Sequence, residues 1–393
     1  MKKMVMALAM VAALLLGLAG GAAAAEPIKI GAFFALSGPA AGIGTPTKLV
    51  AQMVVDKINK AGGVNGRPIE LITADTESDP TKAVMALKKF LAVDKVVAVV
   101  GPTRTDTGMA VKKQIEAAKI PTVMTVGGDP VIMEGKIGNM DFGTAAYVFK
   151  APQRSSTAVE KVLGHLKAKG LSKVALITAS DGFGRDGLRW LTKLAPDFGL
   201  TIVGQEQFNP SDVDMKSQLT KLAAAEPQAI VCWTIGDAGA IVSKNHHALG
   251  LKAPLVQCHG LPGPRYLELA GEAAEGDLMP ATKLMTWQEL PDNDPQKPVI
   301  AEFVKLYNDE YKFGAQYPLN THSGYAWDAI YLIVDAIKKV GDDPEKLKSA
   351  IENTKGYVGV SGVYNLSPQD HNGLGVDSMV MLEVKGGKYA MVK

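Results

Sequence analysis

The polar loop Thr103–Thr107 is the stretch of this chain whose residue types best suit binding of a small charged solute. It follows an apolar, β-branched run at Val96–Val100 and precedes a segment with helical spacing of its apolar residues. The first N–H groups of a helix have no partner within the helix, so a helix beginning here can receive a carboxylate. Arg104 and Thr105 add a cation and a hydroxyl, and both are candidate ligand-binding residues.

A second strand is expected at Thr122–Val126, ending in Gly127-Gly128. The two strands and the helix between them form one strand–helix–strand crossover, so both strands end at the same edge of a parallel sheet. Ligands of open α/β sheets bind outside the carboxyl ends of the strands. The loop after the first of these strands is therefore the first candidate binding site.

Other chemistries find little support in the sequence. Gly38, Gly42 and Gly44 surround a glycine-rich loop expected at Ala40–Gly44, but their spacing matches neither the dinucleotide fingerprint nor the phosphate loop, so an ordinary turn is favoured. There is no G-x-S-x-G elbow and no H-E-x-x-H pair. His246-His247 are adjacent and point to different sides of a helix, which favours a surface position over a metal site. We therefore expect no catalysis, no cofactor and no metal.

The two cysteines, Cys232 and Cys258, fall near the ends of strands expected at Ala229–Thr234 and Pro254–Gln257. Neighbouring strands lie about 4.8 Å apart, which is compatible with a disulfide if the registers match. Two buried thiols are an equally supported alternative, and a zinc site with His259 is a weaker third.

Two further segments follow strands in the second half of the chain. Asp181–Gly184 is expected as a loop before a helix beginning near Gly187, and Trp233–Asp237 follows the next strand but one. Each places aromatic or polar side chains at a sheet edge. Ordinary loop packing explains either segment alone, but their common placement favours a cleft between two sheets.

Strands and helices alternate from Ile28 to about Phe149, and the pattern restarts at Ser155. This order is typical of α/β proteins with parallel sheets. The final hundred or so residues hold too few strands for a third sheet and are expected to complete the first two. We expect two doubly wound parallel-sheet lobes, lobe 1 from 26–149 plus 281–357 and lobe 2 from 150–280 plus 358–393.

The N-terminus has the three parts of a secretory signal peptide: Lys2-Lys3, an apolar run from Met4 to Leu18, and a tail ending in Ala23-Ala24-Ala25. A membrane anchor is the alternative, but the run is short for a bilayer span. We expect cleavage before Glu26 and a periplasmic protein. Loss of the two lysines, the only charged residues in 1–25, lowers the net charge from +2 to 0, which gives no reason to expect nucleic-acid binding.

Several stretches, in order, resemble the substrate-binding proteins of branched-chain amino-acid ABC importers. They include IKIGAFFALSGPAAGIG, INKAGGVNGRP, VVAVVGPTRTDTG, AKIPTV, DGFGRDG and AGEAAEG, and the resemblance spans the chain after the signal peptide. The resemblance implies a type I periplasmic binding fold, in which two lobes joined by a three-stranded hinge close on a solute by a hinge motion.

The resemblance also implies binding residues in lobe 1. The family's serine that holds the ligand carboxylate corresponds to Thr105. The family's Ala-Ala-Thr turn corresponds to Val126-Gly127-Gly128, which has lost the hydroxyl, and the tyrosine of the first loop corresponds to Ile43.

In lobe 2 the family's closing aromatic corresponds to Phe183, and a second tyrosine falls at Thr234-Ile235, with an ambiguity of one residue. The family's acid that takes the ligand ammonium corresponds to His259. With Arg104 close by, the expected pocket is more positive than an amino-acid zwitterion requires.

The sequence thus predicts a monomeric, exported receptor that delivers a small carboxylate to a membrane ABC permease. The ligand is a branched-chain amino acid by family default, or an aromatic or aliphatic organic acid by the chemistry of the pocket. A sensory module that reports to a signalling partner is the alternative, and an enzyme is a distant third.

Overall fold

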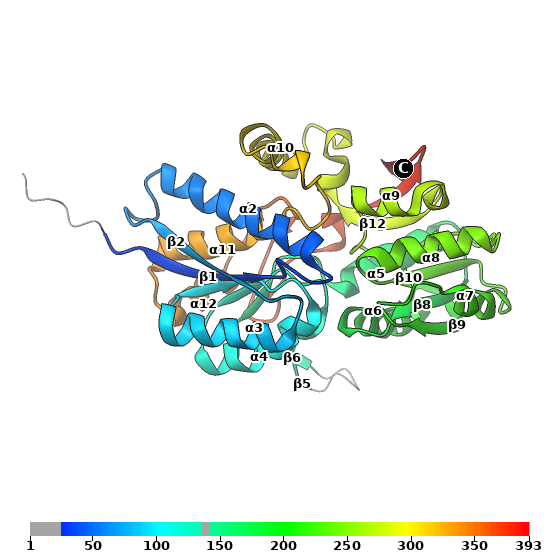
Figure 1. The fold of residues 1–393 in the computed structure, drawn as a ribbon, viewed down its shortest axis with the longest axis horizontal. Coiled ribbons are helices and arrows are strands. Elements are labelled where there is room, and N and C mark those ends of the chain that lie inside the picture. Colours follow the sequence, from blue (N-terminus) through cyan, green and yellow to red (C-terminus); the bar gives the residue numbers. More distant parts are fainter. Residues whose placement is uncertain (1–24, 136–141, 393) are drawn as a thin grey trace, which may run out of the picture.

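The computed structural model describes residues 25–135 and 142–392, and the chain forms two α/β lobes that lie side by side (Figure 1). Lobe 1 is built on a five-stranded parallel sheet of order β2-β1-β3-β4-β7. Its strands are β1 (Ile28–Phe34), β2 (Ile69–Asp75), β3 (Ala98–Val100), β4 (Thr122–Met124) and β7 (Val148–Lys150), and its helices are α2 (Ala41–Lys60), α3 (Pro80–Lys89), α4 (Thr105–Ala118), α10 (Gln296–Lys305), α11 (Tyr325–Val340) and α12 (Pro344–Glu352).

Lobe 2 is built on a seven-stranded sheet of order β9-β8-β10-β11-β12-β15-β16, in which only the pairs β12–β15 and β15–β16 are antiparallel. Its strands are β8 (Lys173–Ala179), β9 (Thr201–Phe208), β10 (Ala229–Trp233), β11 (Leu255–Val256), β12 (Leu278–Thr282), β15 (Met379–Lys385) and β16 (Lys388–Met391), and its helices are α5 (Ser155–Ala168), α6 (Gly182–Leu194), α7 (Lys216–Ala223), α8 (Asp237–Ala248) and α9 (Pro264–Ala270). Two short hairpins, β5 (Met133–Gly135) with β6 (Phe142–Thr144) and β13 (Tyr357–Val358) with β14 (Val363–Tyr364), lie outside both sheets.

Both lobes share one strand order, in which the first strand lies between the second and the third. The order therefore reverses at β1/β3 in lobe 1 and at β8/β10 in lobe 2. Such switch points open a crevice at the carboxyl ends of the strands, where ligands of doubly wound sheets bind. The expected fold of two doubly wound lobes is confirmed.

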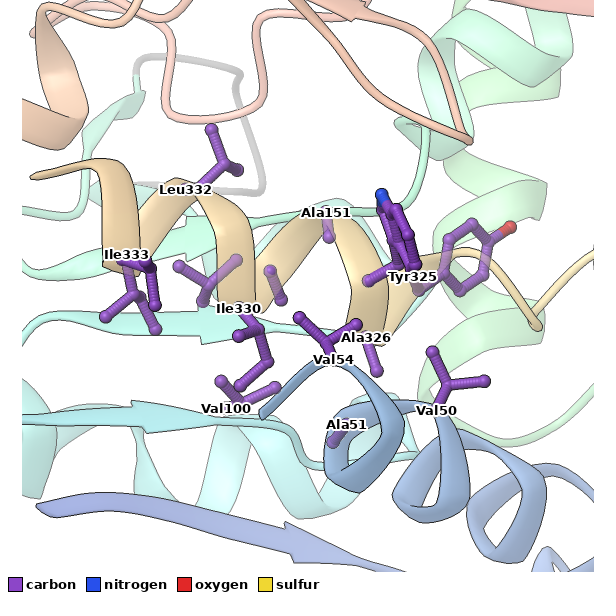
Figure 2. Close-up of a cluster of buried hydrophobic side chains, with 14 of the residues drawn as sticks. Val50, Ala51, Val54, Val100, Ala151, Tyr325, Ala326, Ile330, Leu332 and Ile333 are labelled. Carbon is purple, nitrogen blue, oxygen red and sulfur yellow. The ribbon is translucent and has the colours of Figure 1, made fainter. Parts of the chain in front are cut away.

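The core of lobe 1 depends on a helix from late in the chain. Figure 2 shows Ala326 and Ile330 of α11 beside Val54 of α2 and Val100 of β3, all of them fully buried. An α-helix that is apolar on more than one side is stable only when it is covered on those sides. Lobe 1 is therefore complete only when the chain returns from lobe 2.

The chain crosses between the lobes three times. The first crossing follows β7 and leads into α5, and the second follows β12. The third lies later than the boundary expected at 357/358, because Val360, Tyr364 and Leu374 pack in the core of lobe 1 and the chain next meets lobe 2 at residues 376–379. The Tyr364 hydroxyl donates to the carbonyl of Ala151 (2.6 Å), which holds the β13–β14 hairpin against the first crossing.

Three segments expected as loops are instead the first turns of helices. Helix α2 begins at Ala41, so most of the glycine-rich stretch expected as a loop belongs to it. A Cβ atom on Gly44 would lie 2.1 Å from the carbonyl oxygen of Ala35. In lobe 2 a Cβ atom on Gly184, in the first turn of α6, would lie 1.9 Å from the carbonyl oxygen of Ala179. Glycine at these two positions lets the first turn of a helix pack directly against the end of a strand. The third segment is the polar loop, in which α4 begins at Thr105.

Of the alternatives left open by the sequence, the disulfide is absent and the two buried thiols are present, because both cysteines are free and buried. The register pairs Val231 with Val256, which sets Cys258 one position beyond Cys232. Successive residues of a strand face opposite sides of the sheet, so the two thiols enter different cores. The thiol of Cys258 donates to the carbonyl of Thr234 (2.9 Å), and no cluster of three or more metal-binding side chains occurs in the parts of the chain described.

Residues 1–24 of the expected signal peptide lie outside the described residues. Within the described ranges, no helix is long and apolar enough to span a bilayer.

We expect the protein purified without reductant to contain two free thiols per chain. Alkylation with iodoacetamide should add two groups after denaturation and almost none to the native protein, because both thiols are fully buried and burial raises the pKa of each. Intact mass measures the result. A denatured chain that takes up no label until it is reduced would contradict the opposed register.

Candidate functional site

A small enclosed cavity of about 20 Å³ lies between the lobes at the switch points of the two sheets. Lobe 1 contributes strand ends and the starts of α2 and α4, and lobe 2 contributes the start of α6 and the segments after β10 and β11. The cavity is lined by Ile43, Thr103, Thr105, Thr125, Gly127, Phe183, Ile235, His259, Gly260, His322 and Tyr325. Six of these, Ile43, Thr105, Gly127, Phe183, Ile235 and His259, are candidates from the sequence.

The lobe 1 wall is a row of threonines at the ends of β3 and β4. Thr105 is the first residue of α4, and its hydroxyl oxygen accepts the backbone N–H of Gly128 (3.2 Å). That leaves the hydroxyl hydrogen of Thr105 to donate toward the cavity. Thr125 donates to the carbonyl of Pro102 (2.8 Å), so the two strand ends are tied together behind the wall.

The lobe 2 wall is aromatic. The rings of Phe183 and Trp233 each lie 5.4 Å from the ring of His259. Phe183 also approaches the opposite lobe, because a Cβ atom on Gly127 would lie 2.6 Å from its ring. The glycine at this turn therefore makes room for the closing aromatic.

His259 is 2% exposed, and neither of its ring nitrogens has a hydrogen-bond partner among the described residues. Burial, helped by the charge of Lys150, lowers the pKa of His259 to about 3, so the imidazole is neutral near pH 7. A neutral imidazole offers one donor and one acceptor. Leaving such groups buried and unpaired costs about 1–3 kcal/mol each, which a ligand in the cavity would recover.

The third wall was not predicted. His322 and Tyr325 come from the start of α11, and His322 Nε2 lies 3.1 Å from the carbonyl oxygen of Gly260. Burial lowers the pKa of His322 to about 4. Nothing local in the sequence shows that the start of α11 reaches the sheet edges. Thr103, Thr125 and Gly260 were also missed, although each adjoins a predicted residue.

Three sequence candidates lie behind the cavity wall. Val126 is fully buried in the core of lobe 1, and Gly128 contributes only its N–H to Thr105. Thr234 is buried with its hydroxyl directed at the neighbouring carbonyl of Ile235 (3.4 Å). Of the predicted pair Thr234-Ile235, Ile235 is thus the residue that lines the cavity.

Arg104 is directed away from the cavity and toward the other lobe. Its guanidinium lies 3.3 Å from the carboxylate of Asp181, the N-cap of α6. Asp106 accepts the backbone N–H of Gly182 (3.1 Å), and Arg185 lies 3.9 Å from the same carboxylate. The charges of the polar loop therefore join the lobes, and no charged side chain is among the described residues that line the cavity.

The geometry defines a class: two α/β lobes that enclose a solute cavity at their facing sheet edges. Residues 27–388 match the family described as periplasmic binding protein. This match covers most of the chain, and the protein belongs to that family.

Relatives and solved structures agree with this assignment. Leu/Ile/Val-binding protein homolog 3 of Brucella melitensis is 26% identical over 336 residues, which cover 85% of each chain. The leucine-, isoleucine-, valine-, threonine- and alanine-binding protein of Pseudomonas aeruginosa is 25% identical over 345 residues, 85% of this chain and 84% of that one. The solved structure of an extracellular ligand-binding receptor from Rhodopseudomonas palustris has a TM-score of 0.83 at 27% identity and covers 94% of this chain and 99% of its own. The isoleucine complex of LivJ from Streptococcus pneumoniae, at 24% identity, has the same fold (TM-score 0.78; 93% and 99% covered).

We expect Arg104→Gln and Asp181→Asn to open the lobes in solution. Each change removes the same ion pair between the lobes, Arg104–Asp181. Asparagine at position 181 still serves as the N-cap of α6. A partly exposed pair contributes up to about 1 kcal/mol, so the open fraction should rise about five-fold. Small-angle scattering should show a larger radius of gyration for either variant and no further increase in the double variant. Arg67→Gln breaks a pair within lobe 1 (Arg67–Asp342, 2.7 Å) and should leave the radius unchanged; additive effects of the first two variants would contradict the pairing.

We expect His259→Gln to make the folded protein less sensitive to acid. The pKa of His259 is about 3 in the folded state and 6.5 in the unfolded chain. Below pH 6.5 the unfolded chain therefore binds a proton that the folded state does not, and stability falls as the pH falls. From about pH 5.5 to about pH 4, the wild type should lose about 1.4 kcal/mol per pH unit more than the variant.

Urea unfolding at the two pH values measures this difference. His247→Gln, at an exposed histidine, is the control and should keep the wild-type slope. Equal slopes for His259→Gln and the wild type would mean that the ring is protonated in the folded state.

Proposed function

We propose that this solute-binding receptor closes on a small carboxylate with an apolar tail and delivers it to the membrane permease of an ABC importer. The observation that carries the proposal is the composition of the cavity, which has an unpartnered neutral His259 and no acidic side chain. The function is binding without chemistry.

A carboxylate suits the lobe 1 wall. The first N–H groups of α4 and the free hydroxyl hydrogen of Thr105 are donors, and the N–H of the His259 imidazole is a third. An α-ammonium finds no carboxylate partner among the described residues that line the cavity. Burying it without a carboxylate partner would cost several kcal/mol. The relatives are named for the amino acids that they bind. A preference for an organic acid is therefore what we expect to distinguish this chain from them.

Matched pairs of ligands test the proposal: leucine with 4-methylpentanoate, and phenylalanine with 3-phenylpropanoate. Each pair differs only in the amino group. A ligand at a hundred times its dissociation constant adds about 2.7 kcal/mol, so the acid should raise the melting temperature by a few degrees and the amino acid by less. Thermal shift, followed by calorimetric titration of any binder, measures both.

Thr105→Ala is the site control. It removes one hydrogen bond to a charged group and should weaken binding of the acid about ten-fold, whereas Thr105→Ser keeps the hydroxyl and should bind as the wild type does. A larger shift from leucine or phenylalanine, with none from the acids, would return the ligand to the amino acids.

A further inference from the structure

A second and much larger space adjoins the cavity. It has a volume of about 460 Å³ and shares three wall residues, Ile43, Gly260 and His322, with the inner cavity. We call it the outer chamber. It lies between the start of α2, the segment from Gly260 through α9, and the segment before α11.

The two spaces differ greatly in volume, so they can hold different parts of one ligand. The inner cavity, at about 20 Å³, has room for one water molecule or for a group of that size. Sites for small molecules usually occupy about 300–1,000 Å³, and the outer chamber alone reaches that range. With the lobes as close as they are here, a ligand that reaches His259 must have most of its atoms in the outer chamber.

Prolines and an aromatic ring form part of the wall of the outer chamber, beside polar side chains such as Gln316 and Asn320. Pro39 and Pro46 lie on the lobe 1 side, and Pro262 lies opposite them. The ring of Tyr266 is held in place, because its hydroxyl is hydrogen-bonded to the hydroxyl of Ser243 (2.7 Å) and donates to the buried carboxylate of Asp277. These apolar surfaces suit contact with an aryl or straight-chain group.

Three charged side chains of the described residues line the outer chamber, and Arg265 offsets only one of the two carboxylates, which leaves a net charge of −1. Arg265 lies 3.1 Å from Asp237 and 3.8 Å from Glu268, and all three side chains are more than half exposed. They therefore lie at the solvent-exposed mouth of the outer chamber.

We propose that the inner cavity and the outer chamber are one bipartite site for a monocarboxylate whose aryl or straight-chain tail is longer than a branched-chain side chain. The inference rests on the proposed function. The carboxylate lies in the inner cavity against Thr105 and His259, and the tail passes between Ile43 and His322 into the outer chamber.

Gly42 gives a clean way to fill the outer chamber. It lines this chamber and not the inner cavity, and a Cβ atom added there meets no atom within 4 Å. Because Gly42 lies in the first turn of α2, leucine should favour the helix rather than disturb it. Gly42→Leu therefore places a side chain in the path of the tail, and Gly42→Ala is the matched, smaller change.

The experiment is calorimetric titration of wild type, Gly42→Ala and Gly42→Leu with a short reference acid and two series of longer ones. The reference is 2-methylpropanoate, the phenyl series is 3-phenylpropanoate and 5-phenylpentanoate, and the straight-chain series is hexanoate and octanoate. In the wild type each added methylene should tighten binding about four-fold. Gly42→Leu should weaken the long acids at least about ten-fold and leave 2-methylpropanoate within about two-fold. A steeper gain along the phenyl series or along the straight chains identifies the preferred tail, and either supports the proposal.

Two results would overturn the bipartite site while the proposed function stands: binding of acids that does not depend on tail length, or a loss in Gly42→Leu that is equal for short and long acids. If no acid binds the wild type, the proposed function and this inference fall together.

Discussion

The carboxylate of Asp129 is the point on which the arrangement of the two lobes depends. Asp129 directly follows the turn that lines the cavity, and its carboxylate accepts a hydrogen bond from the fully buried ammonium of Lys150 (3.0 Å) and from the first N–H groups of α5, at Ser155 and Ser156 (2.8 and 3.1 Å). Its own N–H donates to Asp186 of lobe 2 (2.8 Å). Burial alone would raise the pKa of Asp129, but the charge of Lys150 and these bonds hold it below its usual value. One buried ion pair thus fixes the cavity turn, the first crossing and two helices of lobe 2. Removing either partner of such a pair costs about 3–5 kcal/mol, so this centre tolerates little change.

The cavity wall a few residues away has the opposite character. The carboxylate of Asp129 and the ammonium of Lys150 both have hydrogen-bond partners, whereas the ring of His259 lies between Phe183 and Trp233 with both nitrogens unpaired among the described residues. A structure tolerates an unsatisfied buried group where another molecule satisfies it. The contrast separates the part of the interlobe region that positions the lobes from the part that meets a solute. The ion pairs of Arg104 belong to the first part, although the sequence placed Arg104 in the second.

Residue order alone could reveal much of the fold and about half of the cavity. Strand ends in a parallel sheet meet at one edge, so any polar or aromatic residue just after a strand is a fair candidate, and this logic with the family resemblance found Thr105, Phe183 and His259. It failed where the partner is distant along the chain. Arg104 looked like a ligand contact because nothing local shows that Asp181 lies opposite, and Tyr325 was missed because it reaches the sheet edge only after the chain has crossed twice. The sequence could not decide between a disulfide and two buried thiols, since a shift of one residue in strand register reverses the side of the sheet that a side chain faces.

The route of the chain also restricts how this protein can be made. Lobe 1 takes α11, α12 and the β13–β14 hairpin from the last quarter of the chain, and the sheet of lobe 2 is finished by β15 and β16 after that. The N-terminal half therefore cannot bury its apolar helices while it is still emerging from a ribosome, although domains generally fold as units from the N-terminus during synthesis. Contacts of such wide sequence separation slow folding and prolong the time that apolar surface is exposed. The same crossings that join the two lobes thus leave the nascent chain without a finished core until β15 and β16 have been added.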